Sequence, residues 1–178
     1  PLEDVGTFNI SITPINDAPV VTPIPNQTFI EGETLTIELS SFDVDGDTNV
    51  SFSASSLSPD DIFLTLDGSN LTISTIQNYA GSTTVSVIAN DGQIDSDVES
   101  FTLTIENVND APSFDSILNP DAVNEDENNI SIQIQPIDID GDVLSIEALS
   151  SNTGLIENLS NDSILNNSGV YTLNFDPL

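Results

Sequence analysis

Short alternations of apolar and polar residues run along most of the chain, and no stretch shows a convincing helical stripe. A clear example lies over residues 83–89, where Val85, Val87 and Ala89 share one side of the chain and polar residues stand between them. Asp-Gly, Asn and Ser clusters separate such runs, as they do between antiparallel strands. The pattern predicts an all-β chain built from tandem Greek-key β-sandwiches.

Residues 19–111 contain enough of these runs for a whole sandwich of about seven strands. The first strand is expected within 20–30, where Pro23 and Pro25 suit the edge of a sheet. The others are expected at 35–39, 50–52, 62–66, 71–73, 83–89 and 101–105.

Two motifs recur in the same order and at nearly the same spacing. Asn-Asp-Ala-Pro occurs at 16–19 and 109–112, a spacing of 93 residues. Asp-x-Asp-Gly-Asp occurs at 43–47 and 138–142, a spacing of 95 residues. This period is about the length of one immunoglobulin-like domain, so the chain is expected to consist of tandem repeats.

The repeat predicts three segments. Residues 1–18 correspond to the last strand and exit linker of a preceding repeat, 19–111 to a complete repeat, and 112–178 to an incomplete repeat without its last strands. Two interpretations remain open. The chain is an excerpt of a longer array, or it is a subunit whose N-terminal strand completes the open repeat of another subunit.

The net charge of the chain excludes several classes of partner. The chain has 30 acidic residues and no Lys, Arg or His, which gives a net charge of −30. Nucleic acids and anionic membrane surfaces need basic side chains, so neither is expected as a partner. Without Cys, no disulfide can form. Every carboxylate must be solvated, hydrogen-bonded or neutralised from outside, and cations are the ligands that such a field attracts.

Calcium is the cation that the acidic loops favour. Asp43, Asp45 and Asp47 alternate beside Gly46, and Asp138, Asp140 and Asp142 repeat the arrangement. Ca²⁺ prefers six to eight oxygen ligands, which carboxylates, amides and backbone carbonyls supply. An EF-hand does not fit, because its twelfth loop position would be Ala54 or Leu149 in place of Glu. Ordinary turns remain an alternative, because Asp-Gly and Asn-Asp are common turn residues.

Together with Ala89-Asn90-Asp91-Gly92, these motifs resemble the cadherin-like repeats of large prokaryotic surface proteins. The resemblance implies Ca²⁺ at each junction between repeats. The first junction would use Asn16, Asp17, Asp43, Asp45 and Asp91, and the second Asn109, Asp110, Asp138 and Asp140, with Glu31 or Glu33 from the domain before it. The sequence departs from the family where Asp-Arg-Glu is expected, since residues 76–79 read Ile-Gln-Asn-Tyr. Pro14 and Asn107 replace the leading acid of each linker, so about one or two ions per junction are expected.

Several Asn-x-Ser/Thr sequons are candidate glycosylation sites of an exported protein. They begin at Asn9, Asn26, Asn49, Asn70, Asn129, Asn158, Asn161 and Asn166.

The sequence predicts a structural protein rather than an enzyme. Without His, Cys, Lys or Arg, only carboxylates and hydroxyls remain for acid–base or nucleophilic work. The predicted role is a spacer or stalk of an extracellular adhesin or surface filament, stiffened by Ca²⁺. Its partners would be neighbouring repeats, with glycans or a receptor bound by another domain. A self-assembling fibre subunit and a carbohydrate-binding module are the alternatives.

Overall fold

The computed structural model describes residues 6–46, 48–117, 121–122, 130–154, 164–167 and 169–175. Every strand or helix assigned within these residues is a β-strand, which confirms the all-β prediction. No helix in this part of the chain is long and apolar enough to cross a membrane. The chain divides into two compact units, Pro1–Val108 and Asn109–Leu178.

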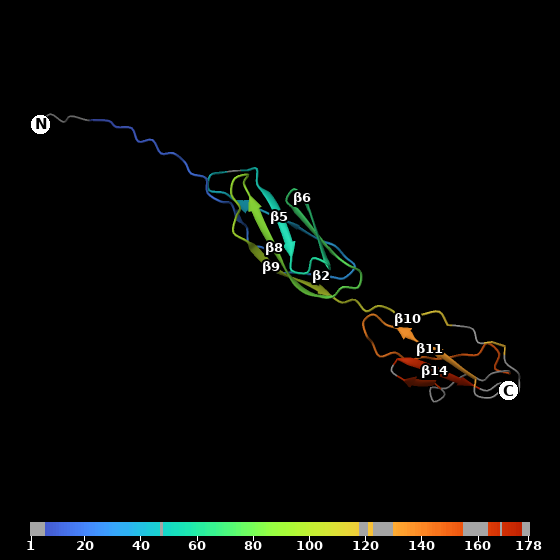
Figure 1. Cartoon of the computed structure of the whole chain (residues 1–178). Helices are drawn as coiled ribbons and strands as arrows, with labels where there is room; N and C mark the ends of the chain where they lie inside the picture. The colour runs from blue at the N-terminus through green and yellow to red at the C-terminus, as the bar shows by residue number, and fades with distance from the viewer. Residues whose placement is uncertain are drawn as a thin grey trace. The chain divides into compact units, whose positions relative to one another are not determined.

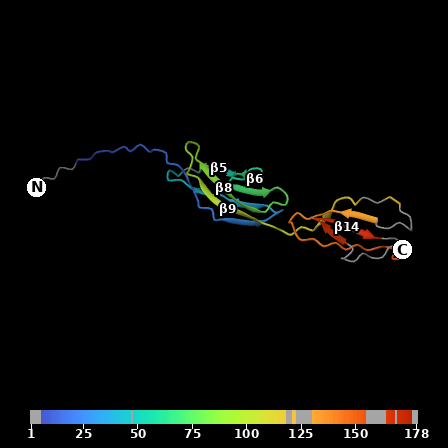
Figure 2. The same cartoon turned by 60° about the horizontal axis from the view of Figure 1, so that its bottom comes forward.

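Unit 1 is a sandwich of two sheets (Figures 1 and 2). One sheet has the order β2-β9-β8-β5 and the other β3-β7-β6, while β1 pairs with β4. This division of strands is that of the immunoglobulin-like fold. The bounds are β1 Val20–Val21, β2 Gln27–Ile30, β3 Leu35–Glu38, β4 Ser41–Phe42, β5 Ser51–Ser56, β6 Ile62–Asp67, β7 Asn70–Thr75, β8 Gly81–Asn90 and β9 Glu99–Glu106.

The core of unit 1 lies between the two sheets. Because alternate residues of a strand point to the same face, β8 buries Val85, Val87 and Ala89 completely, as the sequence predicts. Leu71 and Ile73 of β7 meet them from the other sheet and are also fully buried. Alternation therefore gives each sheet one apolar inner face and one mainly polar outer face, on which Ile30 and Phe63 are exposed exceptions.

The predicted first strand is two strands that belong to different sheets. β1 pairs antiparallel with β4, whereas β2 pairs parallel with β9. Pro23 and Pro25 lie between them, where a missing N–H donor breaks no ladder. The sequence analysis missed β4, because two residues are too few to show a period.

Unit 2 repeats part of this plan. β10 (Ser113–Phe114) pairs with β12 (Pro136–Ile137), as β1 pairs with β4. β11 (Ile130–Ile134), β14 (Val170–Phe175) and β13 (Ile164–Asn167) form a three-stranded sheet like β3-β7-β6. The described residues of unit 2 hold no counterpart of the four-stranded sheet. The domain boundaries expected from the repeat stay a prediction.

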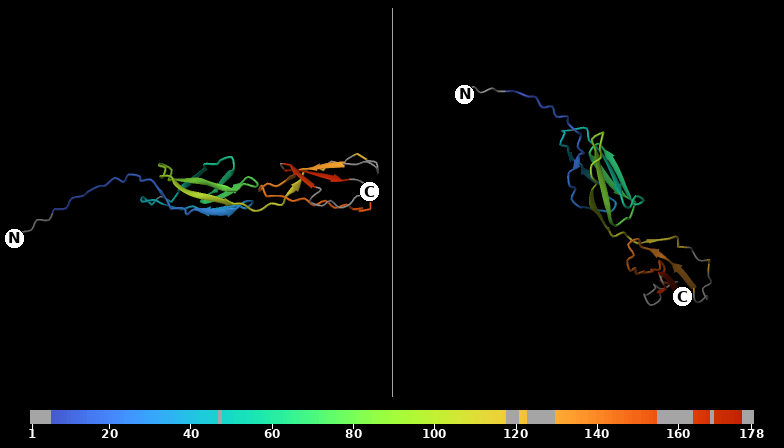
Figure 3. Two further views of the ribbon diagram at one scale, coloured as in Figure 1. Left: turned by 90° about the horizontal axis from the view of Figure 1, so that it is seen from below. Right: turned by 60° about the vertical axis from the view of Figure 1, so that its left-hand side comes forward.

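Residues 6–15 run as an extended segment and form no strand (Figures 1 and 3). Their apolar side chains Phe8, Ile10 and Ile12 are 83%, 75% and 85% exposed. In the repeat these residues correspond to Phe101, Leu103 and Ile105 of β9, which are 2%, 0% and 2% exposed. The apolar side chains of this alternation are thus buried in β9 but exposed in residues 6–15.

Candidate metal centre

The first acidic loop of unit 1 holds one carboxylate almost out of water. Asp43 follows β4 and is 8% exposed. Its Oδ1 accepts a hydrogen bond from the Asp45 backbone N–H at 2.8 Å, which closes the turn. Gly46 continues the turn with φ of 83°, a conformation that favours glycine. The other oxygen, Asp43 Oδ2, is buried and has no hydrogen-bond partner.

The N-terminal linker is attached to this end of unit 1 by hydrogen bonds to two acidic loops. The Asp17 backbone N–H donates to Asp45 Oδ2 at 2.7 Å, and Asn16 Nδ2 donates to Asp91 Oδ2 at 2.8 Å. Gln93 Nε2 donates to Asn16 Oδ1 at 2.7 Å. Sequence reasoning placed the linker residues and the acids together but missed Gln93. Its place two residues after Asp91 is the only signal for it.

Asp91 organises its own loop as well as the linker. Its Oδ1 accepts hydrogen bonds from the Ile94 backbone N–H at 2.8 Å and the Gln93 backbone N–H at 2.6 Å. These bonds, first that of Ile94 and then those of the Asn16 side chain and Gln93, lower the pKa of Asp91 below its ordinary 3.8. The ionised form is therefore the one that the linker and loop bind.

The Asp91→Asn variant is expected to be less stable than the wild type at about pH 6, with a difference that shrinks toward about pH 2. A lowered pKa gives stability that is complete above the ordinary value of 3.8 and is lost as the pH falls through the folded pKa. Thermal unfolding of both proteins at several pH values would measure it. A difference that stays constant across this range would show that the charge of Asp91 is not its cause.

A second isolated carboxylate lies where the chain leaves unit 1. Glu31, directly after β2, is 9% exposed, and its Oε1 accepts a hydrogen bond from the Val108 backbone N–H at 2.6 Å. Its backbone N–H donates to Glu106 O at 3.0 Å, which extends the parallel pairing of β2 with β9. Glu31 Oε2 is buried and has no hydrogen-bond partner. Glu33, the alternative from the sequence, is exposed.

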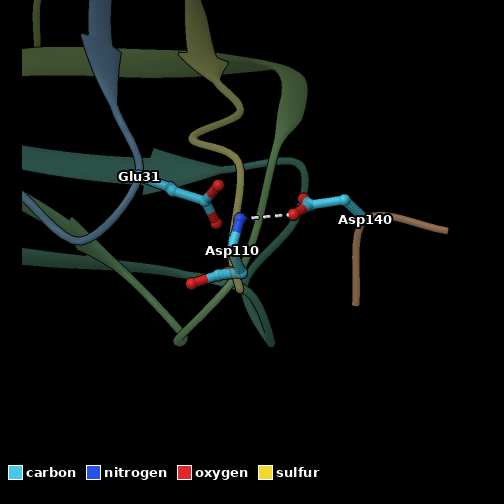
Figure 4. Close-up of side chains that lie close together, drawn as sticks. All are labelled: Glu31, Asp110 and Asp140. Carbon is cyan, nitrogen blue, oxygen red and sulfur yellow. Dashed lines mark hydrogen bonds between the residues drawn. The ribbon is translucent and has the colours of Figure 1, made fainter. Parts of the chain in front are cut away.

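Unit 2 begins with the same local geometry as the linker of unit 1. Asn109 Nδ2 donates to Asp110 O at 3.2 Å, as Asn16 Nδ2 donates to Asp17 O at 3.2 Å. The Asp110 backbone N–H donates to Asp140 Oδ2 at 2.5 Å, and Figure 4 shows this bond. Carboxylate oxygens of Asp110 and Asp140 lie within 4.8 Å of each other. The motif therefore builds an equivalent linker-to-loop contact in each unit.

The remaining predicted ligands belong to the two Asp-x-Asp-Gly-Asp loops. Asp142 donates its backbone N–H to Asp138 Oδ1 at 3.0 Å, and Asp47 lies outside the described residues. Within the described part of unit 1, no three acidic side chains bring oxygens within 4.8 Å of one another.

Among the sequons, Asn9, Asn26, Asn49, Asn70 and Asn166 are exposed, whereas Asn129, Asn158 and Asn161 lie outside the described residues.

The two buried, unpartnered oxygens define what these sites can bind. A buried carboxylate oxygen without a partner is costly, and a chain without Lys, Arg or His has no side-chain cation to offer it. The predicted ligand side chains are carboxylates and amides, whose oxygens suit a hard cation such as Ca²⁺ or Mg²⁺. Zinc sites use mainly thiolate and imidazole, which this chain lacks.

No protein-family model matches this chain, and no curated protein matches it. Among solved structures it is similar to domains 5-6 of the S-layer protein SbsC, with 12% sequence identity over 92% of this chain and 86% of that chain, at a TM-score of 0.37. It is also similar to the tandem Ig repeats of Dlar, with 11% identity over 89% of this chain and 82% of that chain, at a TM-score of 0.33.

Proposed function

We propose that this chain is a spacer segment of an extracellular surface protein, whose tandem sandwiches are stiffened by Ca²⁺ bound where the chain enters and leaves each repeat. One observation carries the proposal. The buried carboxylate oxygens without partners in the described residues are Asp43 Oδ2 and Glu31 Oε2. The first lies in the loops that hold the entering linker, and the second belongs to the side chain that binds the exit at Val108.

Each bound Ca²⁺ would replace the repulsion between neighbouring carboxylates by the attraction of each carboxylate to the ion. At the entry, Asp43 and Asp45 would supply carboxylate oxygens, and the Asn16–Asp91 bond holds the linker beside them. At the exit, Glu31 would supply a carboxylate oxygen beside Val108. In the next repeat, the Asp110–Asp140 pair would supply oxygens to an ion of its own entry. Bound Ca²⁺ would supply positive charge at these positions, and the protein oxygens would orient it. Linkers held at both ends of a repeat bend less, as a stalk requires.

The finer assignment is to the cadherin-like type of repeat. It is supported by the linker motif at 16–19, whose Asn and Asp contact the loops of Asp91 and Asp45. The same motif at 109–112 contacts Asp140. A structural role outside the cell also accounts for a chain rich in sequons and poor in catalytic side chains.

Small-angle X-ray scattering with and without Ca²⁺ tests this function. With about 1–10 mM Ca²⁺, the scattering should fit one rigid particle, and chelation should produce the signature of flexibly linked domains. The control is NaCl at matched ionic strength, because screening alone changes the repulsion within a chain of net charge −30. Identical profiles in Ca²⁺ and in matched NaCl would contradict the proposal.

A further inference from the structure

The strands of unit 1 carry carboxylates only at their ends. Glu38 and Asp67 are the last residues of β3 and β6, and Glu99 and Glu106 are the first and last of β9. In a chain with 30 acidic residues and no basic ones, the middle of each sheet is therefore uncharged. Charge is concentrated at strand ends and in loops.

Hydroxyl groups occupy the outer side of the four-stranded sheet instead. On β8, Ser82, Thr84 and Ser86 face outward, and their partners on β9 are Thr104, Thr102 and Ser100. On β5, Ser55 continues the row of Ser86. We call the outward surface of the whole sheet β2-β9-β8-β5 the hydroxyl face; Figure 1 shows β5, β8 and β9 side by side.

Hydroxyls on this face are partly paired with one another. Ser86 Oγ and Ser100 Oγ are 2.9 Å apart, and Ser82 Oγ and Thr104 Oγ1 are 3.2 Å apart. Each hydroxyl has one donor and two acceptor sites, so a pair that shares one hydrogen bond still offers another O–H and free lone pairs. The face can bond to a second surface of the same kind without any charge.

The outer side of the other sheet differs in charge. Glu38 and Asp67 both pair with Asn70, so two carboxylates stand in one outward row of three strands. The hydroxyl face carries one outward carboxylate, Glu106, at the end of β9. Of the two outer faces of unit 1, the hydroxyl face is the broader and the less charged.

We propose that the hydroxyl face is the surface through which copies of this chain associate side by side. Like charges placed across an interface are strongly unfavourable, and this chain has no cation to relieve them. A second copy can approach closely only where neither surface carries carboxylates. Thr102 stands three residues from Glu99 and four from Glu106, about 10–13 Å along the strand, which exceeds the Debye length of about 8 Å in physiological salt.

The contact is small, so it should be weak and should strengthen with salt. Four strands about 4.8 Å apart and about 20 Å long present roughly 400 Å², half of what each partner buries in a standard interface. Repetition along an array would multiply such contacts. Salt screens the repulsion between the acidic ends, so association should increase with NaCl, whereas a contact based on ion pairs would weaken.

Sedimentation equilibrium of the full chain, from about 10 µM to about 1 mM and from low to about 0.5 M NaCl, tests the proposal. The wild type should associate reversibly, more strongly at high salt. Thr102→Glu should weaken association more than about tenfold, because it places a like charge at the centre of the face in both copies. Thr36→Glu is the matched control: it adds the same charge to an exposed Thr on the outer side of the other sheet. Circular dichroism would check that both variants fold.

Three results would overturn the proposal. The first is a wild type that stays monomeric at every concentration and salt. The second is equal weakening by both substitutions. The third is association that survives Thr102→Glu but is lost when residues 1–15 are deleted, which would assign the contact to exchange of the exposed N-terminal segment. Retention of a monomeric wild type on a neutral polysaccharide, dependent on Thr102, would identify a glycan as the partner instead.

Discussion

Replacing Leu103 by Ala is expected to lower the free energy of unfolding of unit 1 by about 2–5 kcal/mol. Leu103 is fully buried in β9 between its partners on β2 and β8. The smaller side chain removes apolar contacts and leaves a cavity that a close-packed sandwich fills only in part. Because the chain has no Trp, urea unfolding is best followed by circular dichroism, with amide hydrogen exchange of β8 and β9 to separate unit 1 from unit 2.

Ile10→Ala is the control for this substitution. Ile10 occupies the position of Leu103 in the repeat but is 75% exposed, so its truncation should change stability by less than about 0.5 kcal/mol. A loss as large as that of Leu103→Ala would mean that residues 6–15 pack against other chain segments in solution. A small loss from Leu103→Ala would mean that β9 is not a core strand.

Asp43→Asn is expected to abolish the stabilisation by Ca²⁺ at the entry of unit 1 without destabilising the metal-free protein. In chelator, the substitution should be neutral or stabilising, because it removes a buried charge and still leaves an oxygen to accept the Asp45 N–H bond. With Ca²⁺ at about 100 times its dissociation constant, each bound site adds about 2.7 kcal/mol, and the variant loses the share from this site. Thermal unfolding with Ca²⁺ and with chelator gives the four values needed.

Asp67→Asn serves as the matched control, since it removes one charge from an exposed strand end. Both substitutions remove one negative charge, but only Asp43→Asn removes a proposed Ca²⁺ ligand. Comparing the two variants therefore separates the effect of the lost ligand from that of the lower net charge. If Asp43→Asn gained as much stability from Ca²⁺ as the wild type and Asp67→Asn, Asp43 would not be a ligand. If Asp43→Asn unfolded in chelator, Asp43 would hold the loop by its charge alone.

Much of unit 1 could be read from alternation and turn residues. Val85, Val87 and Ala89 are predicted on one face of a strand and lie in the core. This works because a strand has a period of two and a sandwich buries one side of each sheet. The resemblance that Asn-Asp and Asp-x-Asp carry implies a contact between linker and loop, and Asp17 donates to Asp45 as Asp110 does to Asp140.

Other features depend on partners that are distant in sequence. The split of the first strand follows from the parallel pairing of β2 with β9, which no local pattern of residues 20–30 encodes. Gln93 joins the candidate site only because the chain folds Asn16 against its loop. Glu31 and Glu33 are equivalent in a local pattern, and the N–H of Val108 distinguishes them.

The fold class, the repeat and the acidic loops follow from the amino-acid sequence alone, because they depend on local alternation, on spacing and on the absence of any cation. Tertiary structure decided the burial of each copy. Phe8, Ile10 and Ile12 have the same pattern as Phe101, Leu103 and Ile105, but only β9 lies between two partner strands. It also decided which carboxylate oxygens are isolated, since burial without a hydrogen-bond donor is a property of the packed fold and not of the Asp or Glu itself.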